Sequence, residues 1–94
     1  MNCASVLFSG HAVRKMFERG LSKDLVKSAI LCGEIIMEYP DDRPYPSVLV
    51  LGFASGFPVH AVVAKGPGDG QCTVVTAYRP DPALWSDDFK TRRR

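Results

Sequence analysis

Two histidines are the residues best suited to acid–base chemistry, and the first lies near the N-terminus. His11 falls in a segment with helical periodicity, where Arg14, Lys15 and Glu18 share its face. Two neighbouring cations favour the neutral imidazole, which suits a general base. The same pattern also describes a solvated helix face with ordinary ion pairs, so both interpretations stay open.

The second histidine, His60, lies in a segment with the two-residue alternation of a β-strand. If this strand pairs with the last one about the turn near Gly68, His60 lies opposite Thr76, and Tyr78 is its diagonal neighbour on that face. A His and a Tyr at the rim of one sheet face would form an acid–base pair. The alternative is a buried histidine whose hydrogen bonds are satisfied.

The proline-rich segment 40–46 and the glycines at 66, 68 and 70 could suggest ligand binding. Asp41 and Asp42 could hold a metal or act as acid and base, but no matching carboxylate or histidine follows at ligand spacing, and turn chemistry explains them. The glycines join two strands instead of opening a helix, which argues against a phosphate-cradling loop. We therefore expect no metal and no cofactor.

The charge distribution is uneven, although the net charge is only +2 over 94 residues. The basic tail, residues 86–94, concentrates Lys90, Arg92, Arg93 and Arg94 at its end. These cations would contact nucleic-acid phosphates well, and a frayed, solvated terminus is the alternative. A hydrophobic share of 46% with 23% charged residues is typical of a folded chain, and the length predicts a single domain, 1–94.

Cysteine usage and the absence of long apolar segments bear on the compartment. Cys3, Cys32 and Cys72 are odd in number and far apart, which disfavours a disulfide framework or a zinc site. Neither a secretory signal nor an apolar run of about 18 residues is visible. These features predict a cytoplasmic protein with no membrane segment.

The elements that must position these residues follow from periodicity and capping. One helix is predicted from residue 10 to about 19, and its apolar stripe facing the core is Val13, Met16, Phe17 and Leu21. A second helix is predicted over 23–32. The two helices are expected to pack against each other as a hairpin. Strands are predicted over 34–39, 47–53, 59–65 and 72–78, after an unassigned apolar run at 5–8. The fold class is α+β: a two-helix hairpin packed on a four-stranded antiparallel meander. Trp85 and Phe89 indicate that the tail folds back to bury at least one ring.

Several segments together resemble the family called domain of unknown function 4258. They are residues 11–20 (HAVRKMFERG), Cys32-Gly33-Glu34, residues 38–47 (EYPDDRPYPS), and residues 76–80 (TAYRP), with Gly52, Pro58 and His60 between them. Members of this family resemble RelE/ParE/BrnT-like toxins of bacterial toxin–antitoxin pairs, whose fold packs helices on an antiparallel sheet. The resemblance implies a RelE-like fold and a zinc-binding helix-turn-helix antitoxin as partner.

The resemblance also implies an RNA substrate and a metal-independent endoribonuclease, in which a ribose 2′-OH attacks the adjacent phosphate. His11 or His60 would be the base, Tyr78 the acid, and Arg14, Arg19 or Arg79 the stabilising charge. Phosphate contacts would come from other cations, namely Lys15, Arg43, Lys90, Arg92, Arg93 and Arg94. A second hypothesis is a non-catalytic interaction module whose sheet face and 40–46 loop bind a protein partner. We expect a monomer or weak dimer.

Overall fold

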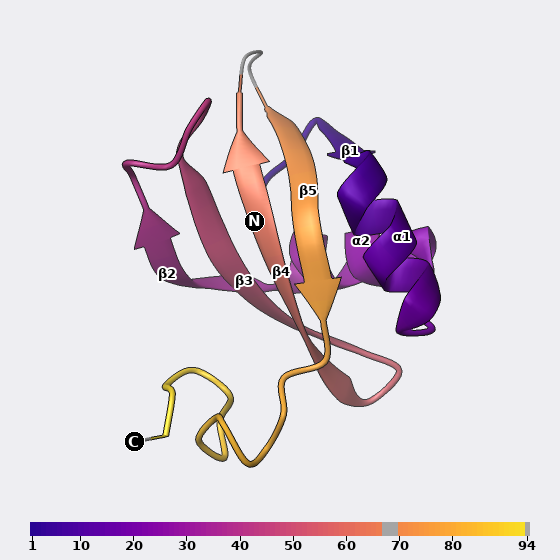
Figure 1. Cartoon of the computed structure of the whole chain (residues 1–94), viewed down its shortest axis with the longest axis vertical. Coiled ribbons are helices and arrows are strands. Elements are labelled where there is room, and N and C mark those ends of the chain that lie inside the picture. The colour runs from indigo at the N-terminus through magenta and orange to yellow at the C-terminus, as the bar shows by residue number, and fades with distance from the viewer. Residues whose placement is uncertain (67–69, 94) are drawn as a thin grey trace.

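A computed structural model describes residues 1–66 and 70–93, and it contains two helices and five strands in these ranges. In chain order they are β1 (Ser5–Phe8), α1 (Gly10–Glu18), α2 (Lys23–Cys32), β2 (Glu34–Tyr39), β3 (Ser47–Ala54), β4 (Phe57–Lys65) and β5 (Gln71–Tyr78). The strands form one sheet in the order β1-β5-β4-β3-β2, with both helices on one side (Figure 1). The α+β class and the meander from β2 to β5 are confirmed.

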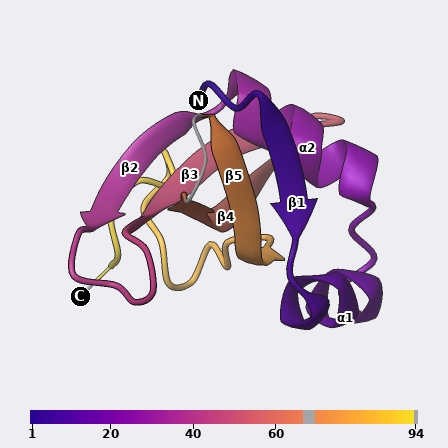
Figure 2. The same ribbon diagram turned by 90° about the horizontal axis from the view of Figure 1, so that it is seen from above.

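The prediction of a purely antiparallel four-stranded sheet is wrong, because the run at Ser5–Phe8 forms a fifth strand. β1 pairs in parallel with β5, with Leu7 opposite Thr73. Val6 and Phe8 pack against the main core while Leu7 is exposed, so this short strand buries one face only. The sheet is therefore mixed, and β1 is one of its two edges (Figure 2).

The core stripe of α1 differs from the predicted one. Ala12, Met16 and Leu21 are buried, whereas Val13 is 38% exposed and Phe17 is 86% exposed. Ser9 caps α1 by accepting a hydrogen bond from the Ala12 N–H. With Ala12 toward the sheet, residue 16 follows one turn later on the same face. Phe17 is thereby directed outward.

The two helices also do not pack as the predicted hairpin. α1 lies on β5, and α2 lies on β3 with a smaller contact to β4. The approach of α2 to the sheet is close: a Cβ at Gly52 would overlap the carbonyl group of Ala29. Each helix packs on its own strands of the sheet, so the short link between them only has to change the direction of the chain. Gly20 allows this change with a φ of +69°. Part of the predicted turn at 66–70 falls outside the described residues.

The cysteine pattern disfavoured a disulfide framework, and this prediction is wrong for one pair of cysteines. Cys3 and Cys72 are joined by a disulfide, and Cys32 is free and exposed. Val6 pairs with Cys72 in the β1–β5 ladder, so strand pairing brings the segment before β1 to the start of β5. Because Cys3 and Cys72 are 69 positions apart, the sequence gives no sign that they lie close together. The argument from cysteine usage to a cytoplasmic protein therefore no longer holds.

The segment after β5 lies on the side of the sheet opposite α2 (Figure 2), where it contacts His60 of β4 and Glu34 of β2. Trp85 is only 5% exposed, which confirms that the tail buries an aromatic ring. Within the ranges described, neither helix is long and apolar enough to cross a membrane. The sheet thus has one face covered by helices and one partly covered by the chain's own C-terminal segment.

Candidate functional site

His60 is the centre of a polar cluster on the sheet face that the C-terminal segment covers. It pairs with Leu51 on β3 and directly with Tyr78 on β5. The sequence predicted Thr76 opposite His60 and Tyr78 only as a diagonal neighbour. Thr76 instead pairs with Val62, and a β-bulge between Val62 and Val63 shifts the register farther along the strands. The ladder therefore brings imidazole and phenol closer than the sequence predicted.

The hydrogen bonds of His60 fix which ring nitrogen carries the proton. Nε2 lies 2.8 Å from the backbone carbonyl oxygen of Phe89, and Nδ1 lies 3.3 Å from the Tyr78 hydroxyl oxygen. A carbonyl oxygen can only accept, so Nε2 carries the hydrogen and donates it. In the neutral ring Nδ1 is then an acceptor, and the Tyr78 hydroxyl donates to it. The phenol proton points at a basic nitrogen.

The C-terminal segment supplies the rest of the surroundings of His60. The Trp85 ring packs edge-on against the imidazole with centroids 4.4 Å apart, and the Tyr78 ring lies 5.3 Å away, also edge-on. Phe89 has a φ of +61°, a left-handed backbone conformation that is unfavourable for a bulky residue. This strained residue contributes the carbonyl that orients His60. His60 itself is 0% exposed.

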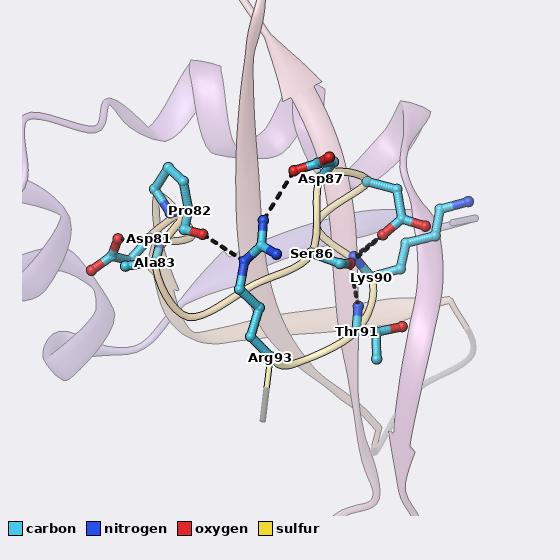
Figure 3. A network of polar contacts seen from close by, with 9 residues as sticks. Asp81, Pro82, Ala83, Ser86, Asp87, Lys90, Thr91 and Arg93 are labelled. Atoms are coloured by element: carbon cyan, nitrogen blue, oxygen red, sulfur yellow. Dashed lines mark hydrogen bonds and ion pairs between the residues drawn. The ribbon is translucent and has the colours of Figure 1, made fainter.

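Polar contacts within the segment hold it in this shape (Figure 3). Arg93 donates from Nε to the Pro82 carbonyl oxygen at 2.9 Å and pairs with Asp87 at 2.9 Å. Ser86 accepts a hydrogen bond from the Thr91 N–H. Lys90 also pairs with Glu34 on β2 at 3.0 Å, which ties the segment to the sheet edge. The basic tail is therefore folded against the protein as far as residue 93.

Burial sets the protonation states of the two central groups. Loss of solvent lowers the pKa of His60 below its ordinary value of 6.5, and the hydrogen bond to Phe89 opposes this shift. Burial, with a smaller contribution from Tyr39, raises the pKa of Tyr78 above 10.0, against the opposing effects of Arg92 and Arg19. At neutral pH the imidazole and the phenol are both uncharged. His60 is therefore available to accept a proton.

Two guanidinium groups flank Tyr78, which is only partly buried. Arg19, the residue that ends α1, donates from Nη1 to the Ala77 carbonyl oxygen at 2.9 Å and to Thr76 Oγ1 at 3.4 Å. Arg92 lies over the Trp85 ring at 5.7 Å. The phenol edge of the cluster is thus electropositive without a metal. In the described residues, no group of three His, Cys, Asp or Glu side chains could hold a metal ion.

The structure separates His11 and Arg14 from this cluster. Both are exposed on α1, and His11 precedes Arg19 by eight residues, which corresponds to about 12 Å along a helix axis. Lys15, on the same helix, pairs with Glu18 at 3.4 Å. The two histidines that the sequence offered as alternative bases therefore lie in different places, one on a solvated helix and one sealed beneath Trp85.

The other predicted basic residues are dispersed. Arg79 stacks on the Phe57 ring at 3.6 Å instead of following Tyr78 toward His60. Arg43 is exposed in the 40–46 loop, where Ser47 donates a hydrogen bond to the Asp42 carboxylate. Arg94 lies outside the described residues. Of the predicted site residues, the structure brings together Arg19, His60, Tyr78 and Arg92.

Comparison with known proteins identifies the family of this chain. The family described as Domain of unknown function (DUF4258) matches residues 8–79. The chain belongs to this family. No curated protein and no solved structure matches the chain.

The DUF4258 match places the cluster partly inside and partly outside the family region. His60, Tyr78 and Arg19 lie within residues 8–79, whereas Trp85 and Arg92 follow that range. The DUF4258 region therefore supplies the imidazole–phenol pair, and the following segment supplies its cover. Sequence reasoning missed the Phe89 carbonyl, because a backbone group leaves no side-chain signal. For Trp85 and Phe89, it predicted only that the tail buries at least one of the two rings.

Proposed function

We propose that the chain is a toxin-like, metal-independent endoribonuclease whose reaction takes place at Tyr78. The observation that carries this proposal is the direction of the Tyr78–His60 hydrogen bond. A partly exposed phenol donates to a buried neutral imidazole, whose other nitrogen is held by the Phe89 carbonyl. This is the arrangement by which a hydroxyl is made more basic toward an incoming proton.

In the proposed reaction a ribose 2′-OH donates its proton to the Tyr78 oxygen while the phenol proton moves to Nδ1 of His60. The 2′-oxygen attacks the adjacent phosphorus, the bond to the 5′-oxygen breaks, and that oxygen takes a proton from water. His60 then returns its proton through Tyr78 to solvent. Tyr78 thus relays a proton to a base, whereas the family resemblance implied that it acts as the acid.

Fixed positive charge stabilises the phosphorane transition state in this scheme. Arg19 donates to the Ala77 carbonyl oxygen next to Tyr78, and Arg92 lies over the Trp85 ring. Both positive charges oppose the rise of the Tyr78 pKa. RNA is the substrate class because the chemistry requires a 2′-OH beside the scissile phosphate. His11, Arg14, Lys15 and Arg43 would contact the RNA backbone farther from the bond that breaks. The likeness of DUF4258 members to RelE/ParE/BrnT-like toxins supports the same assignment.

The test is cleavage of a mixed-sequence RNA by the purified chain in the presence of EDTA. We expect products with 2′,3′-cyclic phosphate and 5′-hydroxyl ends, and a loss of roughly 100-fold or more in Tyr78→Phe. Tyr45→Phe is the matched control, because that phenol lies in the 40–46 loop. An intact RNA, or equal cleavage by wild type and Tyr78→Phe, would refute the proposal.

The second candidate, a non-catalytic interaction module, is favoured by a different observation. His60 is fully buried with both nitrogens hydrogen-bonded, as expected of a structural histidine. Phe17 is almost fully exposed, as expected of a residue that contacts a partner such as an antitoxin. Expression of the wild type and of a His11→Ala, Arg14→Ala double variant separates the two candidates. Growth arrest without RNA decay would favour the module.

A further inference from the structure

β1 leaves part of its backbone without a neighbouring strand. In the part of the chain that the structure describes, it pairs only with β5, and the Ser5 N–H and Ser9 N–H donate to carbonyl oxygens of Gly70 and Val74. In a parallel ladder the residues that bond to one neighbour alternate with residues whose N–H and C=O groups point the other way. Val6 and Phe8 therefore direct their backbone groups away from the sheet.

A groove runs between this free edge and α2. Its volume is about 570 Å³, and it is lined by Val6, Leu7 and Phe8 of β1 and by Lys23, Asp24 and Lys27 of α2. The residues that β1 contributes to the groove are all apolar, and Leu7 is an exposed large side chain. A free strand edge beside an apolar groove is the arrangement by which sheets accept an additional strand.

The wall of the groove is basic. Lys23 and Lys27 lie four residues apart and so share one face of α2, and Lys23 Nζ lies 5.8 Å from the centre of the Phe8 ring. Among the described residues, neither lysine forms a salt bridge. Asp24 offsets one of the two charges, which leaves one uncompensated cation beside the strand edge.

We propose that the edge of β1 binds an acidic, extended peptide segment of a protein partner by strand addition. The outward N–H and C=O groups of Val6 and Phe8 pair with the peptide backbone, and Lys23 and Lys27 attract its carboxylates. A second copy of this chain fits less well, because a two-fold pairing at β1 would bring the same lysines of both copies to one interface. This surface is separate from the Tyr78 site, so the proposal does not depend on the proposed function.

The probe is a capped, fluorescently labelled peptide of eight residues in which Glu and Val alternate. A Lys–Val peptide tests the charge requirement, and a Glu–Val peptide with proline at two central positions tests strand pairing. We expect saturable fluorescence anisotropy with the acidic peptide only. Backbone amide resonances of Val6 and Phe8 should shift on binding. Binding of the proline-containing peptide with equal affinity would overturn the proposal.

Substitutions in the protein, instead of in the peptide, test the same contacts. Lys27→Glu should weaken binding roughly tenfold. Lys65→Glu changes the net charge equally but lies at the exposed end of β4, and it should not weaken binding. Val6→Pro removes an outward N–H without removing a β1–β5 hydrogen bond, and it should abolish binding. Equal affinities of Lys27→Glu and Lys65→Glu would overturn the proposal. A wild-type dimer, detected by sedimentation, that the acidic peptide fails to displace would also overturn it.

Discussion

Trp85→Ala tests whether the C-terminal segment controls the protonation of His60. The indole is 5% exposed and packs edge-on at 4.4 Å from the imidazole, so its removal admits water to a ring that is now sealed. Burial is the main cause of the lowered pKa of His60. We therefore expect this pKa to rise toward 6.5 in the variant, as followed by NMR titration of the imidazole protons.

The same substitution has a predictable effect on stability. Replacing a buried Trp by Ala costs about 3–5 kcal/mol in well-packed cores, and Trp85 covers one sheet face, so about 3 kcal/mol is expected here. For a chain of this size that corresponds to a fall in Tm of roughly 12–24 °C. Leu84→Ala is the control, because Leu84 is adjacent and exposed, and its effect should stay within about 0.5 kcal/mol. An unchanged His60 pKa in Trp85→Ala would refute the reasoning.

Three further predictions concern stability. The Cys3–Cys72 disulfide joins residues 69 positions apart, and its reduction should lower the free energy of unfolding by about 2–4 kcal/mol in urea titrations. Thiol titration should find one reactive cysteine before reduction and three after it. Gly52→Ala should lower the Tm, since its methyl group would overlap the carbonyl of Ala29; a Tm equal to that of wild type would contradict the close packing of α2. The folded-state pKa of His60 lies below its unfolded value of 6.5, so its contribution to stability is complete above pH 6.5 and declines as the pH falls toward the folded-state pKa. Denaturation midpoints between pH 7.5 and 5 should fall less steeply in His60→Gln than in wild type.

Much of the fold could be predicted from periodicity and capping. Ser9 and Ser22 cap the two helices, and alternation located the strands of the meander. β1 could not be assigned, because a four-residue segment with three apolar residues is too short to show a period that distinguishes strand from helix. The Cys3–Cys72 bond depends on that same strand, so it was missed together with it. The outward position of Phe17 follows from how α1 rotates on β5, which a helical pattern of only two turns does not determine.

The candidate site could be predicted only in part. Alternation placed His60 and Tyr78 on one face, but the position of the β-bulge decided that they pair directly. The cover over His60 involves a backbone carbonyl and a left-handed residue at Phe89, and neither can be identified from composition. His11 shared a helix face with cations as expected, yet its distance from the sheet cluster is a tertiary property that helix periodicity does not report.

The most direct test of the central claim compares two RNA substrates that differ at one atom. In the second substrate, sulfur replaces the bridging 5′-oxygen at the scissile phosphate, and a thiolate leaves without needing a proton. If Tyr78 relays the 2′-OH proton to His60, Tyr78→Phe should slow cleavage of both substrates by a similar factor in single-turnover measurements. Restoration of the wild-type rate on the sulfur substrate would contradict the relay and assign Tyr78 the role of acid.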